Sequence, residues 1–79
     1  MKKYDNKLNV IGKLLQEHRE KKRFSKEEVC RKVQLYGVYI DRTELYRMEL
    51  GEHTIRDFEL IALCEVLGID YNTEVRKSI

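Results

Sequence analysis

Polar side chains suited to hydrogen bonding gather within residues 42–47. They are Arg42, Thr43, Tyr46 and Arg47. In a helix these four share one side, while Leu45 and Met48 lie on the other. An arginine offers two parallel N–H donors that match the O6 and N7 acceptors of guanine, and this pairing discriminates against a wrong base by about 1–3 kcal/mol. The set therefore predicts contacts with the base edges of a nucleic acid.

Two short helices are predicted to position this polar surface. Ser25, with Glu28 three residues later, predicts a capping box that starts a helix over 25–33. Asp41 suits the start of a second helix over 41–50, because a carboxylate accepts from free N–H groups and complements the helix dipole. Two short helices joined by a glycine-containing turn, the second with a polar outer side, are typical of a helix-turn-helix that reads DNA.

The rest of the chain predicts three further helices around this pair. A first helix is expected over about 9–22 and a fourth over about 57–67, and residues 71–79 predict a short C-terminal helix or tail. Residues 1–7 have the composition of a flexible basic arm. The inner stripes of the first and fourth helices are Leu8, Ile11, Leu15 and His18, and Leu60, Leu63, Cys64 and Leu67. The sequence predicts a single all-α domain over 1–79, a compact five-helix bundle.

Charge is distributed unevenly along the chain. Residues 13–32 carry eight Lys or Arg and four Glu, a net charge of +4, whereas residues 49–74 carry one Arg and seven acids, a net charge of −6. A polyanion would be attracted to the first region and repelled by the second. Taken alone, the basic run at 21–23 also fits a solvated surface. Beside a helix start it predicts phosphate contacts. The residues expected in that role are Arg23, Ser25, Lys26 and Arg56.

Other classes of function find no support in the sequence. Cys30 and Cys64 are expected to be buried free thiols, and His18 and His53 lack metal-ligand spacing to them or to each other. The residues form no recognisable catalytic constellation or phosphate-binding glycine loop, so neither an enzyme nor a cofactor is predicted. The lack of long apolar runs and of a signal peptide predicts a cytoplasmic protein without a membrane partner. The sequence implies no pocket for a small-molecule ligand.

The chain resembles the Cro/repressor-type (XRE-like) helix-turn-helix family, whose fold is the five-helix domain of lambda and 434 repressors. The resemblance spans about residues 9–71. It rests on four stretches in register, IGKLLQEHRE, FSKEEVCRKV, RMELG and DFELIALCEVLGID. It implies sequence-specific binding of double-stranded DNA and transcriptional regulation, as a repressor. It also implies that Arg42, Thr43 and Arg47 are the main base-reading positions.

The same resemblance implies that Arg19 and Glu49 form a buried ion pair that braces the reading helix. The chain departs from the family in two places. The link QLYGVYI between the paired helices is longer than the usual turn, and Lys26 stands where the family typically has Gln. A lysine keeps a phosphate contact but lacks the amide that braces the reading helix. Tyr36 and Tyr39 in the link either cover the core or reach a phosphate with a hydroxyl group.

A homodimer on a pseudo-palindromic operator is predicted, because two heads one helical turn apart double the contacts of one short reading helix. The expected interface is an apolar surface formed by Phe58, Ile61, Ala62, Tyr71 and Val75. Alternatively, Tyr71 and Val75 fold back to seal the core of the monomer. Glu44 either accepts from cytosine N4 or repels phosphate. A helix-turn-helix that contacts proteins, such as an antitoxin or adaptor, also fits, because the acidic residues 49–74 would suit it.

Overall fold

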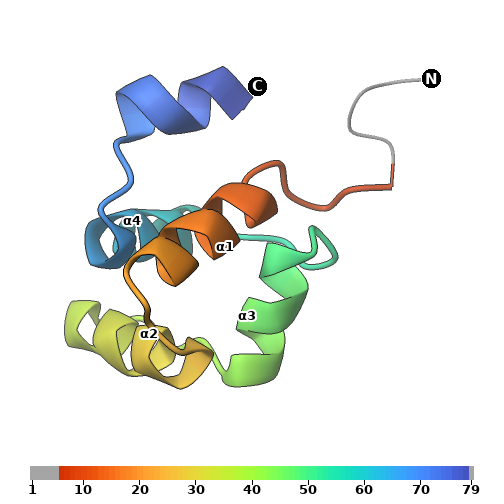
Figure 1. Ribbon diagram of the computed structural model, residues 1–79. Coiled ribbons are helices and arrows are strands. Elements are labelled where there is room, and N and C mark those ends of the chain that lie inside the picture. The colour runs from red at the N-terminus through yellow and green to blue at the C-terminus, as the bar shows by residue number, and fades with distance from the viewer. Residues whose placement is uncertain (1–5, 79) are drawn as a thin grey trace.

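The computed structural model describes residues 6–78, and every regular element in that range is helical (Figure 1). The elements are α1 (Gly12–Lys21), α2 (Lys26–Val33), the 3₁₀ turn η1 (Gln34–Tyr36), α3 (Arg42–Glu49), α4 (Asp57–Leu67), the π-helical turn η2 (Tyr71–Val75) and the 3₁₀ turn η3 (Arg76–Ser78). The predicted all-α fold is confirmed, with η2 and η3 as the fifth helical segment. Most of the arm predicted at 1–7 lies outside the described residues. No helix between residues 6 and 78 combines the length and the apolar character that a membrane span requires.

The helices α2 and α3 both begin with a capping box. The Ser25 hydroxyl accepts from the backbone N–H of Glu28 at 3.1 Å, and the Glu28 carboxylate accepts from the backbone N–H of Ser25. Asp41 accepts from the N–H of Glu44 at 2.8 Å, and the Glu44 carboxylate accepts from the N–H of Asp41 at 3.3 Å. Each cap contributes about 0.5–2 kcal/mol. Glu44 therefore takes part in the cap of α3, a role that was not predicted from the sequence.

The helix α1 begins three residues later than the sequence indicated, because Asn9 is used outside the helix. Its side-chain amide donates to the carbonyl of Met48 at 3.0 Å and to that of His53 at 2.8 Å, while its carbonyl accepts from the N–H of Ile11. Asn9 thus ties the start of α1 to the end of α3. Leu8, expected on the inner stripe, precedes the helix and is 60% exposed.

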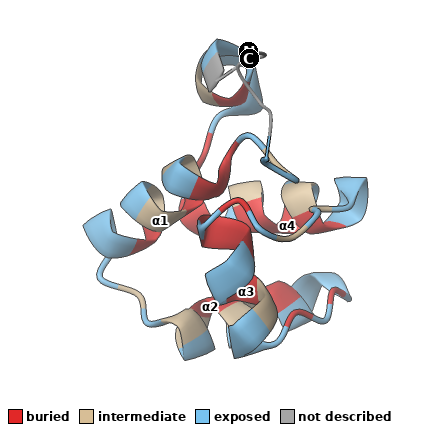
Figure 2. Cartoon of the chain, turned by 90° about the vertical axis from the view of Figure 1, so that its right-hand side faces the viewer, coloured by how far each residue is buried: buried red, intermediate tan, exposed pale blue. Residues whose placement is uncertain are grey.

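One hydrophobic core lies between the four α-helices, and Figure 2 shows the buried residues on their inner sides. The most completely buried large side chains are Leu15, Val29, Val33, Ile40, Leu45, Met48, Leu63 and Leu67. The helices α1 and α3 approach each other closely at Gly12, where a Cβ atom would lie 2.3 Å from the carbonyl oxygen of Met48. The absence of a side chain at Gly12 therefore lets α1 pack directly against the backbone that ends α3.

The long link between α2 and α3 is a folded turn that extends α2. Gly37 adopts φ +76° and donates to the carbonyl of Gln34, which closes η1. Val38 and Ile40 are then buried in the core, at 6% and 2% exposure. Tyr36 and Tyr39 point outward, at 54% and 73%, so the interpretation that they cover the core is wrong. Over residues 38–40 the positions alternate, so Val38 and Ile40 face inward and Tyr39 faces outward, whereas Leu35 and Tyr36 before the glycine are both exposed.

The C-terminal segment folds back onto α1 through one buried side chain and one polar contact. Val75 is 4% exposed, and His18 Nε2 lies 2.7 Å from Glu74 Oε1. The other carboxylate oxygen of Glu74 accepts from the backbone N–H of Asp70 at 2.9 Å. Val75 therefore seals the core of the monomer, and Ala62 is 1% exposed in the same core. Neither residue is available to the intermolecular interface that the sequence predicted, whereas Phe58, Ile61 and Tyr71 are exposed.

Candidate nucleic-acid interface

The outer side of α3 presents four polar side chains, and its inner side is packed in the core. Arg42, Thr43, Tyr46 and Arg47 are exposed. Leu45 and Met48, on the opposite side of the same helix, have no exposed surface and anchor it in the core. The helical spacing expected from the sequence is thus realised, because three- and four-residue steps return to the same side of a helix. The four donors can therefore be presented together to one partner surface.

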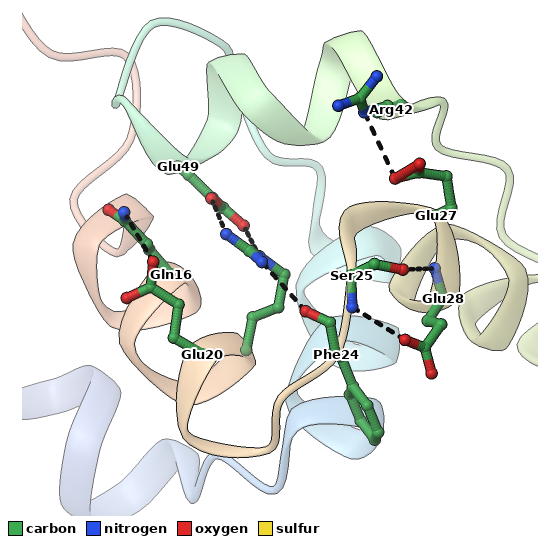
Figure 3. A network of polar contacts seen from close by, with 9 residues as sticks. Gln16, Glu20, Phe24, Ser25, Glu27, Glu28, Arg42 and Glu49 are labelled. Carbon is green, nitrogen blue, oxygen red and sulfur yellow. Dashed lines mark hydrogen bonds and ion pairs between the residues drawn. The ribbon is translucent and has the colours of Figure 1, made fainter.

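A buried ion pair fixes the end of α3 (Figure 3). Arg19 Nε lies 2.6 Å from Glu49 Oε2, and Arg19 Nη2 lies 3.1 Å from Glu49 Oε1. Arg19 Nη1 also donates to the carbonyl of Phe24 at 3.0 Å, so one guanidinium joins α1, the turn after it and α3. Both side chains are at least nine-tenths buried. The hydrogen bond to Glu49 is the main cause that raises the pKa of Arg19.

Two contacts join the start of α2 to the outer side of α3. Arg42 Nε lies 3.4 Å from Glu27 Oε1, and both side chains are more than 60% exposed (Figure 3). Such an exposed pair contributes little, about 0–1 kcal/mol, so Arg42 can leave Glu27 for a ligand. Lys26 Nζ lies 5.7 Å from the centre of the Tyr46 ring. A cation–π contact therefore links α2 to α3 at Lys26, the position where the sequence departs from the family it resembles.

A hollow forms where these two helices meet. Lys26, Arg42, Thr43 and Tyr46 line it. Three of these residues were expected at bases and one at phosphate, and the fold brings them to one site. The other base-reading candidate, Arg47, lies farther along α3 and is exposed. The hollow combines cationic, hydroxyl and aromatic groups, which suits a phosphodiester backbone and the edges of its bases.

The remaining phosphate candidates lie at helix ends. Ser25 caps α2 and is exposed, with its hydroxyl engaged by Glu28. Arg23 lies in the turn before α2 with φ +59°, a left-handed conformation that costs about 1–2 kcal/mol for a residue with a side chain. Arg56 immediately precedes α4, and its guanidinium carbon lies 6.0 Å from the centre of the Phe58 ring. The turn at Arg23 therefore holds an exposed cation where glycine or asparagine would be less strained.

Three residues that support the site were not identified from the sequence. Asn9 and Gly12 hold the start of α1 against the end of α3, and Lys7 Nζ donates to the carbonyl of Leu50 at 3.2 Å. Their partners lie about forty residues away in the chain, at positions 48–53. A lone Asn before a helix and a Gly near its start are compatible with many local structures. Only the tertiary packing distinguishes these roles.

The thiols and histidines do not form a second centre in the described part of the chain. Burial is the main cause that raises the pKa of both Cys30 and Cys64, each of which is half-buried. His53 lies 3.8 Å from Glu44, at the outer end of the capping box. Within residues 6–78 no three His, Cys, Asp or Glu side chains are grouped to hold a metal ion.

Comparison with known proteins adds one finding. A family model described as a helix-turn-helix domain matches residues 10–76, which include all four α-helices and η2. No curated protein and no solved structure matches the chain. A domain of this description indicates nucleic-acid binding, in agreement with the polar outer side of α3.

Proposed function

We propose that this chain, which belongs to the helix-turn-helix domain family, binds double-stranded DNA sequence-specifically and represses transcription. The observation that carries the proposal is the outer side of α3, where two arginines, a threonine and a tyrosine are exposed. The opposite side of the helix is anchored in the core by Leu45 and Met48, which are fully buried. The major groove admits an α-helix and presents a distinct donor and acceptor pattern for each base pair. We propose a cytoplasmic site of action, as the sequence predicts.

Arg42, Thr43 and Arg47 are proposed to read bases, with Tyr46 beside them. Arg42 would exchange its weak contact with Glu27 for a guanine edge, because a bidentate pair with a base outweighs an exposed ion pair. Lys26 is proposed to bind phosphate from its place over the Tyr46 ring. A single lysine would then both hold the DNA backbone and support the reading helix.

Arg23, Ser25 and Arg56 are proposed as the other phosphate contacts. Ser25 would contribute at the positive end of α2, where unpaired backbone N–H groups favour an anion. The left-handed backbone at Arg23 supports its assignment, because strain at an exposed residue is often retained for function. These contacts carry no base information, and they set the register of α3 in the groove.

The proposal is tested by selecting binding sites from random duplex DNA and comparing variants on the selected site. Arg47→Ala should relax the preference at one base position and reduce the binding free energy for the selected site by about 1–3 kcal/mol. Lys26→Ala should weaken binding to all sequences alike, and the dependence of log affinity on log salt concentration should become less steep by about one. Lys77→Ala, an exposed cation of η3, is the matched control. If Arg42→Ala and Arg47→Ala leave the selected sequence unchanged, α3 is not the reading helix.

We further propose that two copies bind one pseudo-palindromic operator and meet through Phe58. Its ring is 49% exposed at the start of α4. Association of this small surface would be weak in solution and would be completed on DNA, where two bound heads lie one helical turn apart. Phe58→Glu should therefore reduce two protomers per full site to one. Because Arg56, a proposed phosphate contact, lies beside the Phe58 ring, the loss on the full site is compared with the variant's own affinity for a half-site.

Leu35→Glu, which adds the same charge at an 85% exposed apolar residue of η1, is the control for this experiment. Band-shift stoichiometry on full and half sites is the measurement. A single protomer on the full site for the unaltered chain would contradict the dimer, and an unaffected dimer in Phe58→Glu would contradict this contact.

A further inference from the structure

A groove runs along the outer side of α4, against the segment that follows it. The aliphatic and aromatic side chains of Leu60, Ile61 and Tyr71 contribute to its lining. Ile61 is 65% exposed and Tyr71 50%, which is unusual for large apolar residues so close together. Two of them, Ile61 and Tyr71, were predicted to lie at a homodimer interface. With Ala62 and Val75 buried, the flat apolar face expected for that interface is replaced by this groove.

The second wall of the groove is held in place by a defined turn. The chain reverses after α4, and the N–H of Ile69 donates to the carbonyl of Cys64 at 2.9 Å. Asp70 then caps η2 by accepting from the N–H of Asn72 at 3.0 Å, and the Glu74 carboxylate accepts from the N–H of Asp70. The wall that carries Tyr71 is thus formed before any partner binds, so little conformational entropy would be lost on binding.

Acidic side chains lie along the groove. Asp57, Glu65 and Asp70 all line it and are exposed. Among the described residues that line it there is no Lys or Arg. An acidic edge repels nucleic acid and anionic lipid, and it would also repel an identical acidic edge on a second copy. The charge pattern instead complements a cationic protein segment.

The groove lies apart from the reading helix. The helix α4 packs against α1 and α2, and α2 packs in turn against α3 (Figure 1). An occupant of the groove would not need to displace DNA from α3. Asp57 and Glu65 are eight residues apart on α4, a rise of about 12 Å, which matches about two turns of a partner helix laid alongside.

We propose that this groove binds a short amphipathic helix of another protein, with apolar side chains on one side and Lys or Arg on its flanks. The apolar residues would contact Leu60, Ile61 and Tyr71, as in other complexes of a helix with an apolar groove. The cationic flanks would face Asp57, Glu65 and Asp70 and fix the direction of the bound helix. The protein would thereby bind DNA on one side and a basic protein segment on another.

The test uses the full chain and a fluorescent synthetic helix of about 14 residues, long enough for marginal helicity in water, with Leu on one side and Lys on its flanks. Two reference peptides isolate the two features of the partner: one scrambles the same composition so that no side is apolar, and the other replaces Lys by Glu. Fluorescence anisotropy should show the designed helix binding at least about tenfold more tightly than either reference peptide, a difference of roughly 1.4 kcal/mol.

Variants of the chain locate the contact. Ile61→Ser removes an exposed apolar side chain, and Glu65→Lys reverses one edge charge. Each should weaken the designed helix by about tenfold or more. Glu17→Lys, an exposed residue of α1 outside the groove, changes the net charge equally and should have no comparable effect. The melting temperature of each variant shows whether it is folded.

Two results would overturn the inference. If the scrambled peptide binds the chain as tightly as the designed helix does, or if Glu17→Lys and Glu65→Lys weaken the designed helix equally, the attraction is by surface charge alone. Loss of the second protomer on a full DNA site in Ile61→Ser, with no binding of the designed helix to the unaltered chain, would mean that the groove receives a second copy.

Discussion

Arg23 combines a strained backbone with an exposed positive charge, and the two can be separated by mutation. Asparagine tolerates the left-handed conformation better than other residues with side chains. Arg23→Asn should therefore raise the melting temperature by a few degrees while weakening DNA binding, because a 1 kcal/mol gain shifts the midpoint of a small domain by roughly 4–8 °C. Lys22→Asn is the control, since Lys22 is a neighbouring cation with a right-handed φ of −84°. Equal melting temperatures for the two variants would exclude backbone strain as the cause.

At Gly12 the absence of one methyl group allows α1 and α3 to pack closely. Alanine favours a helix interior by about 1 kcal/mol over glycine. At this position its Cβ would meet the Met48 and Glu49 carbonyl oxygens at 2.3 and 2.7 Å, and backbone atoms cannot move aside cheaply. We expect Gly12→Ala to lower the free energy of unfolding by about 1–3 kcal/mol, as other overpacked sites do. Urea denaturation measures it, with exposed Lys13→Ala as the reference, and a stabilised Gly12→Ala would refute the close approach.

At the scale of elements, the Arg19–Glu49 pair is expected to govern the position of α3. Removing either partner leaves the other buried alone, so each single alanine variant should lose about 3–5 kcal/mol, and the double variant much less than the sum. Arg42 and Glu27 form the matched exposed pair, for which the coupling should lie near 0–1 kcal/mol. The two double-mutant cycles are compared by chemical denaturation. Equal coupling in both would remove the proposed role of burial.

The C-terminal segment should be released by acid before the core unfolds. The backbone N–H of Asp70, and secondarily His18, lowers the pKa of Glu74 below the usual 4.5. The folded state therefore binds this proton less tightly than the unfolded state, so the contact stabilises η2 above pH 4.5 and is lost as the pH falls through the lowered value. Glu74→Gln should remove that acid dependence from the amides of η2.

Hydrogen exchange across this pH range provides the measurement, and α2 provides its own reference. The backbone N–H of Ser25 lowers the pKa of Glu28, so the amides that start α2 should keep their acid dependence in Glu74→Gln. Loss of acid dependence in both elements would show that the change is global.

Much of this architecture could be predicted because its signals are local. Ser25 with Glu28 and the apolar spacing of Leu45 with Met48 each depend on residues within one helical turn. The errors came where distant partners decide. Asn9 donates to the carbonyls of Met48 and His53, and Leu8 before it is exposed. Val75 is buried in the segment that folds back onto α1 through the His18–Glu74 contact. Sequence spacing identifies a polar helix side, and only packing identifies which apolar side faces the core.

At the scale of the whole molecule, charge and function are divided between regions. The basic region at 13–32 includes α2 and the turn before it, whereas the acidic region at 49–74 includes α4. An approaching polyanion would thus meet the outer side of α3 and the start of α2 before it meets α4. The proposed groove for a basic segment lies in the acidic region, so its occupant and DNA would not compete for the same charges.

The guanidinium of Arg19 also bears on the DNA binding proposed above, through the shape of the duplex. It joins α1, the following turn and α3 in one hydrogen-bonded unit, so α3 cannot tilt independently to suit different duplexes. Any mismatch in curvature or groove width between the protein and a duplex would have to be absorbed by the duplex. Operators with pliable pyrimidine–purine steps at positions the protein never touches would then bind more tightly than stiff ones with identical contacted bases.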